Sequence, residues 1–334
     1  MKLFCKTGCV LWDSASKWPR RTYQSDSCTV FAYHENKPKH TMTISLLILT
    51  HNRPNELLKC LNSLKSEQGN LLEILILDNG SQVKLQASAL SEFTKLKIFH
   101  SEKNLGVAGG RNWLAQRAKG ELLWFLDDDA SLRTNQACEL IRSYFKKTQL
   151  ALVSFKILNA YSREEEKRCI PHVDKHLTQV DVAAAYFVGC SFVTRRQLFL
   201  ETGGFWENFE YSCEELDLSY RLLNQNYEIL RSHSLQVVHA YSPTSARHQS
   251  WIYFNTRNRP WTAIRNLPLK YIPSYILGWW IYAGAIGFKQ SEFKLFYQAV
   301  TASLKGFFSA VKTRSVISPP ACEKVRRLGG RLWY

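Results

Sequence analysis

Three adjacent aspartates, Asp127, Asp128 and Asp129, follow an apolar run, LLWFL at 122–126. An apolar run of this length is typical of a strand that is buried on both faces of a parallel sheet. Three carboxylates at the end of such a strand repel one another unless a positive charge lies beside them. A divalent cation, which prefers oxygen ligands, would supply that charge. The sequence therefore predicts a metal site at the end of this strand.

A second group of acids begins a predicted helix in CEELDLSYRL, residues 213–222. Glu214, Glu215 and Asp217 lie in its first turn, where carboxylates complement the helix dipole. Dipole complementation alone would explain them. A carboxylate in this position could equally act as a general base toward a hydroxyl group. Both interpretations stay open on the residues alone.

The segments between these acids alternate between strand and helix patterns. Strands are predicted at 43–49, 73–78, 96–100 and 122–126, and helices at 54–66, around 83–93 and at 111–119. This alternation predicts an α/β fold with parallel strands whose carboxyl ends form the ligand-binding edge. THNR at 50–53 and DNGS at 78–81 end the first two strands. We therefore expect their polar groups to lie beside the aspartates, although DNGS alone could be an Asx turn.

Composition narrows the class of protein. The net charge of +16 implies an anionic partner. No GxxxxGK[ST] or GxGxxG sequence is present, which argues against a P-loop or a dinucleotide fold. The nine cysteines are scattered and predict free thiols, neither a disulfide framework nor a zinc ribbon. The N-terminal residues do not read as a signal peptide, so we expect a cytoplasmic location.

Four segments in this order and spacing resemble family 2 glycosyltransferases of the GT-A fold: THNRPNELLKCLNSL, ILILDNGS, NLGVAGGRN and LLWFLDDDA. Residues 189–229 are similar to the acceptor-side and catalytic-base segment of that family. Within the family, the chain as a whole resembles the rhamnosyltransferase-like bacterial polysaccharide enzymes. The resemblance, which extends over about 43–266, implies a mostly parallel twisted sheet flanked by helices. It places the catalytic domain at 42–255, with a nucleotide-sugar half at about 42–130 and an acceptor half at about 131–255. Residues 1–41 would be an N-terminal extension and 256–334 a basic, aromatic helical region.

The resemblance implies metal-dependent transfer of a sugar, with inversion, from a nucleoside-diphosphate sugar to a hydroxyl of a saccharide or lipid-linked acceptor. The pathway would be cell-surface polysaccharide synthesis, as of O-antigen or capsule. Mg²⁺ or Mn²⁺ would be held by Asp129, with Asp127 and His239 as further ligands; Asp128 could substitute for either aspartate. A lone histidine such as His239 is also often structural.

The same resemblance assigns the remaining site residues. Glu215 would be the catalytic base, with Glu214 and Asp217 as alternatives, and Trp206 would either stack on the acceptor sugar or belong to the core. Asp78 would hydrogen-bond the nucleotide base, and Arg111 would approach the base or the diphosphate. The nucleotide-sugar pocket would include Thr50, Asn52, Arg53, Asp78, Asn79, Gly109, Gly110, Arg111, Asp127 and Asp128. The donor sugar stays open, because dTDP-rhamnose, UDP-galactose and UDP-N-acetylglucosamine all have family precedents. No oligomeric state is implied.

The C-terminal region combines aromatic residues with positive charge. Residues 271–288 carry no charge, and their 18 positions are at the lower limit for a membrane span. Residues 292–312 place apolar side chains on one helical stripe, and 289–334 contain nine Lys or Arg against two acids. This pattern predicts docking on the anionic inner face of the plasma membrane. A helical subdomain packed on the catalytic domain is the alternative.

Two other functions fit parts of the sequence. A nucleotidyltransferase acting on sugar phosphates also uses paired aspartates and nucleoside phosphates. A polyanion-binding protein would use the positive charge, but no nucleic-acid-binding motif is present, so we expect no nucleic-acid partner. A glycosyltransferase accounts for more of the pattern than either alternative.

Overall fold

The computed structural model describes residues 41–86, 90–172, 174–177, 179–240 and 245–332. Met42–Tyr334 form one compact unit. The predicted N-terminal extension, apart from Thr41, lies outside the described residues.

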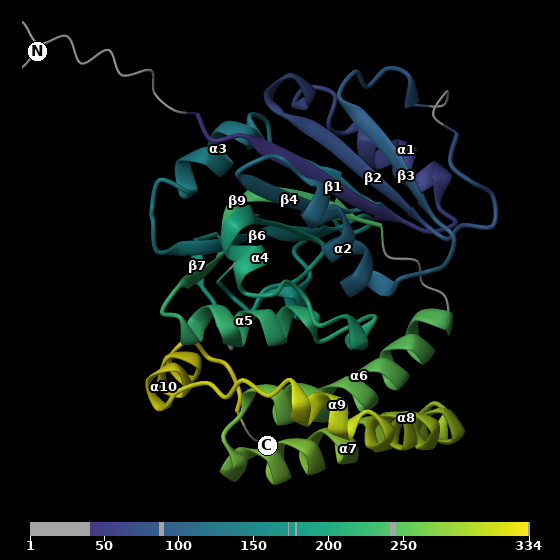
Figure 1. Ribbon diagram of the computed structural model, residues 1–334, viewed down its shortest axis with the longest axis vertical. Helices are drawn as coiled ribbons and strands as arrows, with labels where there is room; N and C mark the ends of the chain where they lie inside the picture. The colour runs from purple at the N-terminus through teal and green to yellow at the C-terminus, as the bar shows by residue number, and fades with distance from the viewer. Residues whose placement is uncertain (1–40, 87–89, 173, 178, 241–244, 333–334) are drawn as a thin grey trace, which may run out of the picture. The chain divides into compact units, whose positions relative to one another are not determined.

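The described chain is built around a mixed nine-stranded sheet (Figure 1). The strands are β1 (Ile44–Thr50), β2 (Glu73–Asn79), β3 (Leu96–Ser101), β4 (Leu122–Asp127), β5 (Ala130–Leu132), β6 (Leu150–Asn159), β7 (Val182–Ala183), β8 (Ser191–Arg195) and β9 (Glu228–His239). The order is β3-β2-β1-β4-β8-β6-β9-β5, with β7 also paired to β9. The first four strands are parallel, as the sequence predicts, whereas β8 runs antiparallel to both β4 and β6. The second half therefore makes the sheet mixed.

Strand register brings the polar ends of the strands together. Thr50 pairs with Asp78, and Leu49 pairs with Asp127 across the β1–β4 ladder. On the other side of the aspartates, Ala130 of β5 pairs with His239 at the end of β9. Because the carboxyl ends of parallel strands meet at one edge, segments far apart in sequence meet here.

The two faces of the sheet support two separate cores, because successive side chains of a strand point to opposite faces. Leu46 and Ile48 pack in a cluster with α1 (Pro54–Asn62) and α3 (Ala137–Tyr144). Leu47 packs on the opposite face with α2 (Gly106–Arg117), α4 (Arg196–Glu201), α5 (Glu214–Asn224) and α10 (Pro319–Arg327). Residues of β1 are buried on both faces, which accounts for their nearly unbroken apolar sequence.

Three predicted helices differ from the structure. The one expected at 54–66 ends at Asn62. The one expected around 83–93 is not an α-helix at 83–86 or 90–93, where only Leu90 has 3-10 helical geometry, and 87–89 lie outside the described residues. The one expected at 111–119 begins earlier, at Gly106, so the glycine-rich segment is its first turns and not a loop. A Cβ at Gly110 would lie 2.5 Å from Leu49 Cδ1. Gly110 therefore lets α2 pack closely on β1.

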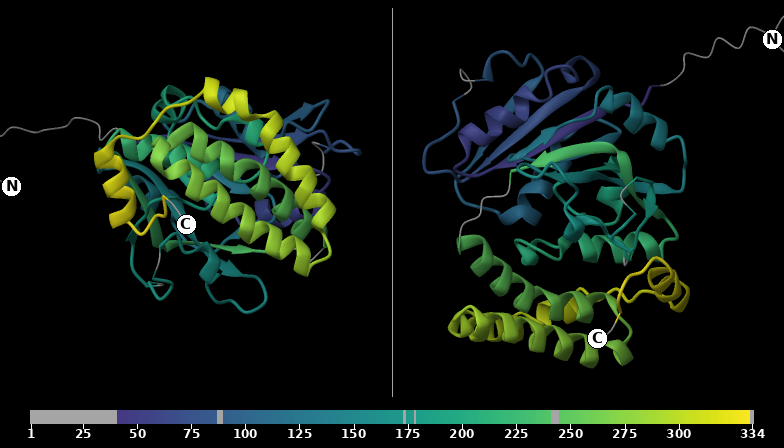
Figure 2. Two further views of the ribbon diagram at one scale, coloured as in Figure 1. Left: turned by 90° about the horizontal axis from the view of Figure 1, so that it is seen from below. Right: turned by 180° about the vertical axis from the view of Figure 1, so that it is seen from behind.

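The C-terminal helices form a layer against α5 (Figures 1 and 2). They are α6 (Ser245–Asn266), α7 (Ile272–Lys289), α8 (Phe293–Lys305) and α9 (Phe307–Lys312). The stripe expected at 292–312 is thus two helices that meet at Gly306. Helix α6 runs through residues 255 and 256, where the sequence predicts a domain boundary. That boundary stays a prediction. No helix in the part of the chain that the structure describes has the length and hydropathy that a membrane crossing requires.

Replacing Gly306 by alanine is expected to destabilise the C-terminal layer. A Cβ there would lie 2.1 Å from Trp261 Cζ2, and the Trp261 indole is buried and donates a hydrogen bond to the Ser303 carbonyl at 2.8 Å. Overpacking of this kind costs about 1–3 kcal/mol, which chemical denaturation would measure as a lower free energy of unfolding. The matched control is Gly69→Ala, where a Cβ meets nothing within 4 Å. Equal stability of the two variants would contradict this account of the packing.

Candidate active site

The loops that follow β1 and β2 are joined by hydrogen bonds at the carboxyl edge of the sheet. The backbone N–H of Asn52 donates to Ser81 Oγ at 2.8 Å, and Asn52 Oδ1 accepts from the Gln82 N–H at 2.9 Å. Asn79 Oδ1 accepts from the Leu105 N–H just before α2, and its Nδ2 donates to Asn104 Oδ1. These contacts hold three of the segments predicted to form the nucleotide pocket against one another.

Asp78 is more enclosed than its predicted contact with a nucleotide base requires. It is 1% exposed, and its carboxylate accepts from the N–H groups of Ser81 and Leu85 and from His100. Burial alone would raise the pKa of Asp78, but these hydrogen bonds outweigh it and lower the pKa. In this conformation Asp78 anchors the loop after β2, and base recognition stays a prediction.

The three aspartates of the triplet point to different partners. Asp128 is buried, accepts from Thr50 Oγ1 at 2.7 Å and lies 3.3 Å from Arg53 Nη1. Burial raises the pKa of Asp128 to about 7, against the opposing effects of Thr50 and Arg53. Arg53 is half-exposed and also contacts Asp129 Oδ2 at 2.9 Å. Thr50 and Arg53, predicted to line the nucleotide pocket, are thus in direct contact with these acids.

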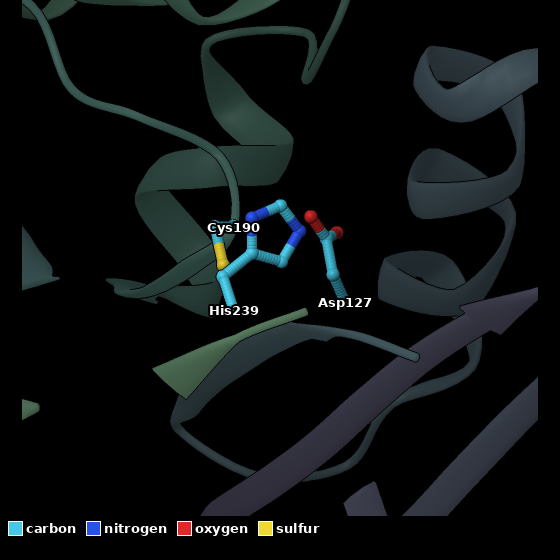
Figure 3. A group of neighbouring side chains, drawn as sticks. All are labelled: Asp127, Cys190 and His239. Carbon is cyan, nitrogen blue, oxygen red and sulfur yellow. The ribbon is translucent and has the colours of Figure 1, made fainter. Parts of the chain in front are cut away.

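The two outer aspartates lie near His239, which ends β9; Figure 3 shows Asp127 beside it. Asp129 Oδ1 is 2.9 Å from His239 Nε2. Asp127 and His239 form a group with Cys190 in which one ligand atom from each residue lies within 4.8 Å of the others. Carboxylate and imidazole are ligands of divalent cations in proteins. The donor set at this point therefore fits the predicted metal.

Arg111 lies between the aspartates and the acids of α5. Its Nη2 donates to Asp127 Oδ1 at 2.8 Å and to the Gly189 carbonyl at 2.7 Å, while its Nη1 lies 3.6 Å from Glu214 Oε1. A Cβ at Gly189 would lie 2.4 Å from Glu215 Oε1 and 2.7 Å from Arg111 Nη1, so both groups lie directly over this glycine. Arg111 is thus a buried bridge between two groups of acids, and its predicted approach to the base or diphosphate stays a prediction.

Glu214 and Glu215 differ in accessibility. Glu214 is 2% exposed, whereas Glu215 is half-buried. Burial raises the pKa of both carboxyl groups, Glu215 further raises that of Glu214, and Arg111 opposes the shift in each. A raised carboxyl pKa suits a general base that works near neutral pH. Glu215 combines that shift with access to solvent.

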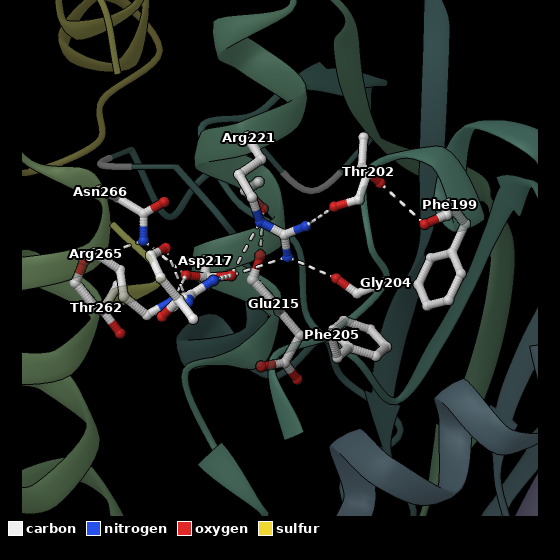
Figure 4. Close-up of polar contacts among 12 residues, drawn as sticks. Phe199, Thr202, Gly204, Phe205, Glu215, Asp217, Arg221, Thr262, Arg265 and Asn266 are labelled. Carbon is white, nitrogen blue, oxygen red and sulfur yellow. Dashed lines mark hydrogen bonds and ion pairs between the residues drawn. The ribbon is translucent and has the colours of Figure 1, made fainter. Parts of the chain in front are cut away.

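Asp217, the third predicted candidate for the base, is completely buried in an ion cluster (Figure 4). It contacts Arg221 Nη2 at 2.9 Å and Arg265 Nε at 2.8 Å, and Asn266 Nδ2 donates to it at 2.7 Å. Burial would raise the pKa of Asp217, but the two arginines and the hydrogen bonds outweigh it and lower the pKa. A carboxylate enclosed in this way has no access to an acceptor hydroxyl. Its geometry is that of a structural tie between α5 and α6.

Trp206 lies on the loop between α4 and α5. Its ring packs edge-on against Phe209 and Trp261, and the Arg265 guanidinium lies 4.4 Å from its centroid. The half-buried ring lines a cavity of about 370 Å³ together with Gly203, Gly204, Arg221 and Arg265. Packing therefore covers part of Trp206, and stacking on an acceptor sugar stays a prediction.

The two glycines predicted to approach the nucleotide lie inside α2. Gly110 faces Leu49 of the sheet, and a Cβ at Gly109 would meet Leu105 at 3.3 Å. Their contacts are thus with the protein itself, and a contact with the donor stays a prediction.

Sequence reasoning missed two residues of this region, Cys190 and Arg265. Cys190 directly precedes β8, and Asp127 N–H donates to its carbonyl at 2.9 Å. The position of Cys190 directly before β8 was a signal only once the antiparallel β4–β8 pairing was known, because that pairing brings it beside the aspartates. Arg265 lies in α6, 48 residues after Asp217, and no spacing rule connects the two.

Comparison with known proteins identifies the family. Residues 45–203 match the family described as Glycosyl transferase family 2. An uncharacterized protein of Haemophilus influenzae is 31% identical over 168 residues, which cover 48% of this chain and 91% of that protein.

Solved structures are similar in fold at low identity. A structure of residues 1–349 of S. aureus TarS is similar with a TM-score of 0.56 at 15% identity, over 86% of this chain and 83% of that one. A mannosyltransferase of Pyrobaculum calidifontis, PcManGT, solved with GDP-Man and Mn²⁺, gives a TM-score of 0.54 at 15% identity, over 87% of this chain and 80% of that one. At such identities the likeness shows the fold alone.

The chain belongs to glycosyl transferase family 2 and has the GT-A fold that its sequence predicts. It is therefore a glycosyltransferase.

Asp217→Asn is expected to lower the free energy of unfolding by about 3–5 kcal/mol at pH 7, because it leaves Arg221 and Arg265 buried without their counter-charge. The folded-state pKa of Asp217 is below its unfolded value, near 4. Its stabilisation is thus present above about pH 4 and is lost as the pH falls through the folded-state pKa, so the variant should show a shallower acid dependence. Denaturant titrations from pH 2 to 7 measure both effects.

The matched control is Glu215→Gln, an amide substitution in the same helix. Because the pKa of Glu215 is raised, the folded state disfavours its charge, and neutralising it should leave stability unchanged or higher at pH 7. Similar losses of stability in the two variants would show that Asp217 is not the tie described above.

Proposed function

We propose that this enzyme transfers a sugar, with inversion, from a nucleoside-diphosphate sugar to a hydroxyl of a saccharide or lipid-linked acceptor in cell-surface polysaccharide synthesis. One observation carries the proposal: Arg111 contacts Asp127 through one nitrogen and lies 3.6 Å from Glu214 through the other. The acids proposed to hold the metal and the acids proposed to abstract a proton thus lie on two sides of the same arginine, Arg111.

The donor half of the proposal rests on Asp127, Asp129 and His239. These residues would hold Mg²⁺ or Mn²⁺, consistent with the Mn²⁺ present in the PcManGT structure. When bound, the cation acts as a Lewis acid that stabilises the departing nucleoside diphosphate. Arg53, half-exposed beside Asp128 and Asp129, is placed to add a positive charge to the phosphate oxygens. Thr50, Asn52, Asp78, Asn79 and the glycines of α2 belong to the proposed nucleotide side.

The acceptor half rests on Glu215. Its half-buried carboxylate, with a raised pKa, would accept the proton of the acceptor hydroxyl as the oxygen attacks the anomeric carbon. The new glycosidic bond forms while the bond to the diphosphate breaks on the opposite side of the sugar. A single displacement of this kind inverts the anomeric configuration. Arg111 would orient Glu215 and balance its charge, and Asp217 would fix the helix that carries it.

The C-terminal helices support a membrane-bound acceptor. Exposed apolar side chains lie along α7, α8 and α9, with four exposed lysines and one glutamate between Ile272 and Lys312; among the most exposed are Phe288, Phe293, Tyr297, Leu304 and Phe308. Apolar and cationic groups side by side favour docking on an anionic leaflet. A peripheral position at the inner face of the plasma membrane would give the active site access to a lipid-linked acceptor.

Nucleoside-diphosphate release from a panel of nucleotide sugars, with Mn²⁺ or Mg²⁺, tests the catalytic proposal. Wild-type protein should release diphosphate. Asp129→Ala should abolish release, because the cation that stabilises the departing diphosphate would lose a protein ligand. Glu215→Gln should lower kcat by roughly 10²–10⁴-fold, the usual contribution of a general base, and leave the KM for the donor nearly unchanged.

Glu102→Gln, an exposed acid after β3, is the control and should keep full activity. Pyrophosphate in place of nucleoside diphosphate would indicate nucleotidyl transfer. Full activity of Asp129→Ala would refute the metal site, and full activity of Glu215→Gln would refute the base.

Co-sedimentation with anionic vesicles tests the docking proposal. Phe288→Ser combined with Phe308→Ser removes two side chains that are each 80% exposed and should weaken binding to phosphatidylglycerol vesicles by at least about tenfold, since both would insert into the interface. Val83→Ser removes an 84% exposed side chain from the loop after β2 and should bind as wild type does. Wild-type protein that stays in the supernatant at moderate salt would refute membrane docking.

A further inference from the structure

Cys190 is a buried thiol that the proposed reaction does not use. Its sulfur, a ring nitrogen of His239 and a carboxylate oxygen of Asp127 all lie within 4.8 Å of one another (Figure 3). Cysteine sulfur, histidine nitrogen and carboxylate oxygen are the three ligand types of protein zinc sites. The cluster therefore offers a mixed donor set, in contrast to the oxygen-only set that Mg²⁺ prefers.

Strand ends place two of the three residues, and Cys190 lies in the turn directly before β8 (Ser191–Arg195). Asp127 ends β4, and its N–H donates to the Cys190 carbonyl at 2.9 Å. His239 ends β9, where it pairs with Ala130 of β5. In a tetrahedral site with bonds of about 2.0–2.3 Å, neighbouring ligand atoms lie roughly 3.5 Å apart. Separations of up to 4.8 Å need to contract by about 1.3 Å at most, which side-chain rotation can supply.

The surroundings of Cys190 differ from those of the nearby Cys60. Cys60 Sγ donates a hydrogen bond to the Asp127 carbonyl at 3.6 Å. Within the residues that the structure describes, no hydrogen bond to the Cys190 sulfur is found, although it lies among polar side chains. Cys190 is also 5% exposed, so its sulfur is enclosed with Asp127 and His239. A sulfur in this position is available as a ligand.

We infer that Cys190 is a ligand in the proposed metal site and makes that site accept thiophilic divalent cations such as Co²⁺, Zn²⁺ and Cd²⁺. The inference rests on the proposed function, because it extends the same site. The thiol loses its proton to solvent as the sulfur–metal bond forms, and no electron transfer is involved. Thiolate ligands favour Zn²⁺ and other soft ions over Mg²⁺ or Mn²⁺, so the site should bind thiophilic ions more tightly than either.

Titration of the full-length protein with Co²⁺ alone tests the inference through its absorption spectrum. Thiolate ligation produces a near-ultraviolet sulfur-to-cobalt charge-transfer band, which is separate from the visible bands of bound cobalt. We expect the band in wild-type protein and in the control Cys138→Ser, whose thiol lies in the core with α3. We expect Cys190→Ser to lose the band and to bind Cd²⁺ at least about tenfold more weakly, since even outer-shell partners contribute that much to metal affinity.

Several results would overturn the inference: no bound cobalt in the wild type, bound cobalt without the charge-transfer band, or a band that persists in Cys190→Ser.

The catalytic proposal is judged separately by diphosphate release with Mn²⁺. If release occurs but the band is absent, only the role of Cys190 fails. If the band forms but no nucleotide sugar releases diphosphate with any cation, the proposed reaction fails and the thiolate ligand stands. Circular dichroism of Cys190→Ser checks that the variant is folded.

Discussion

Repulsion among carboxylates is the constraint on which the rest of this structure depends. Asp127, Asp128 and Asp129 end one strand, and Glu214 and Glu215 begin a helix nearby. Such a concentration of buried negative charge is unfavourable unless positive groups are placed among the acids. Arg111 supplies one such charge from within α2, between the two groups of acids. Arg53 supplies another from the exposed side.

The C-terminal layer is part of the same electrostatic arrangement. Arg265 of α6 and Arg221 of α5 neutralise Asp217 from opposite directions, and Asn266 adds a hydrogen bond (Figure 4). Arg221 also donates to the carbonyls of Thr202 and Gly204, so the loop before α5 is attached to the same cluster. The helix that carries Glu215 is thus fixed on two sides. The surface proposed to dock on a membrane and the helix that carries the proposed base therefore belong to one packed assembly.

Much of the fold was predictable because it depends on local pattern. The apolar runs before THNR, DNGS and DDD correctly indicated parallel strands, and the resemblance correctly indicated the family. The helix expected around 83–93 was wrong in its described parts, and α2 began five residues early. In α2 the glycines lower intrinsic helix propensity, but close packing of Gly110 on Leu49 compensates. The stripe at 292–312 is divided into two helices at Gly306, where a Cβ would meet Trp261, a residue outside the segment.

By itself, the sequence determined the residue types and the strand ends at which they lie, because hydrophobic periodicity and charge are properties of short segments. Only the tertiary structure decided which acids meet. Asp128 points to Thr50, Asp127 lies with Cys190 and His239, and Asp217 is enclosed by arginines. The antiparallel pairing of β8 with β4 and the crossing of α5 with α6 set these partners. Both join segments separated by tens of residues, and such pairings follow from the packing of the whole chain.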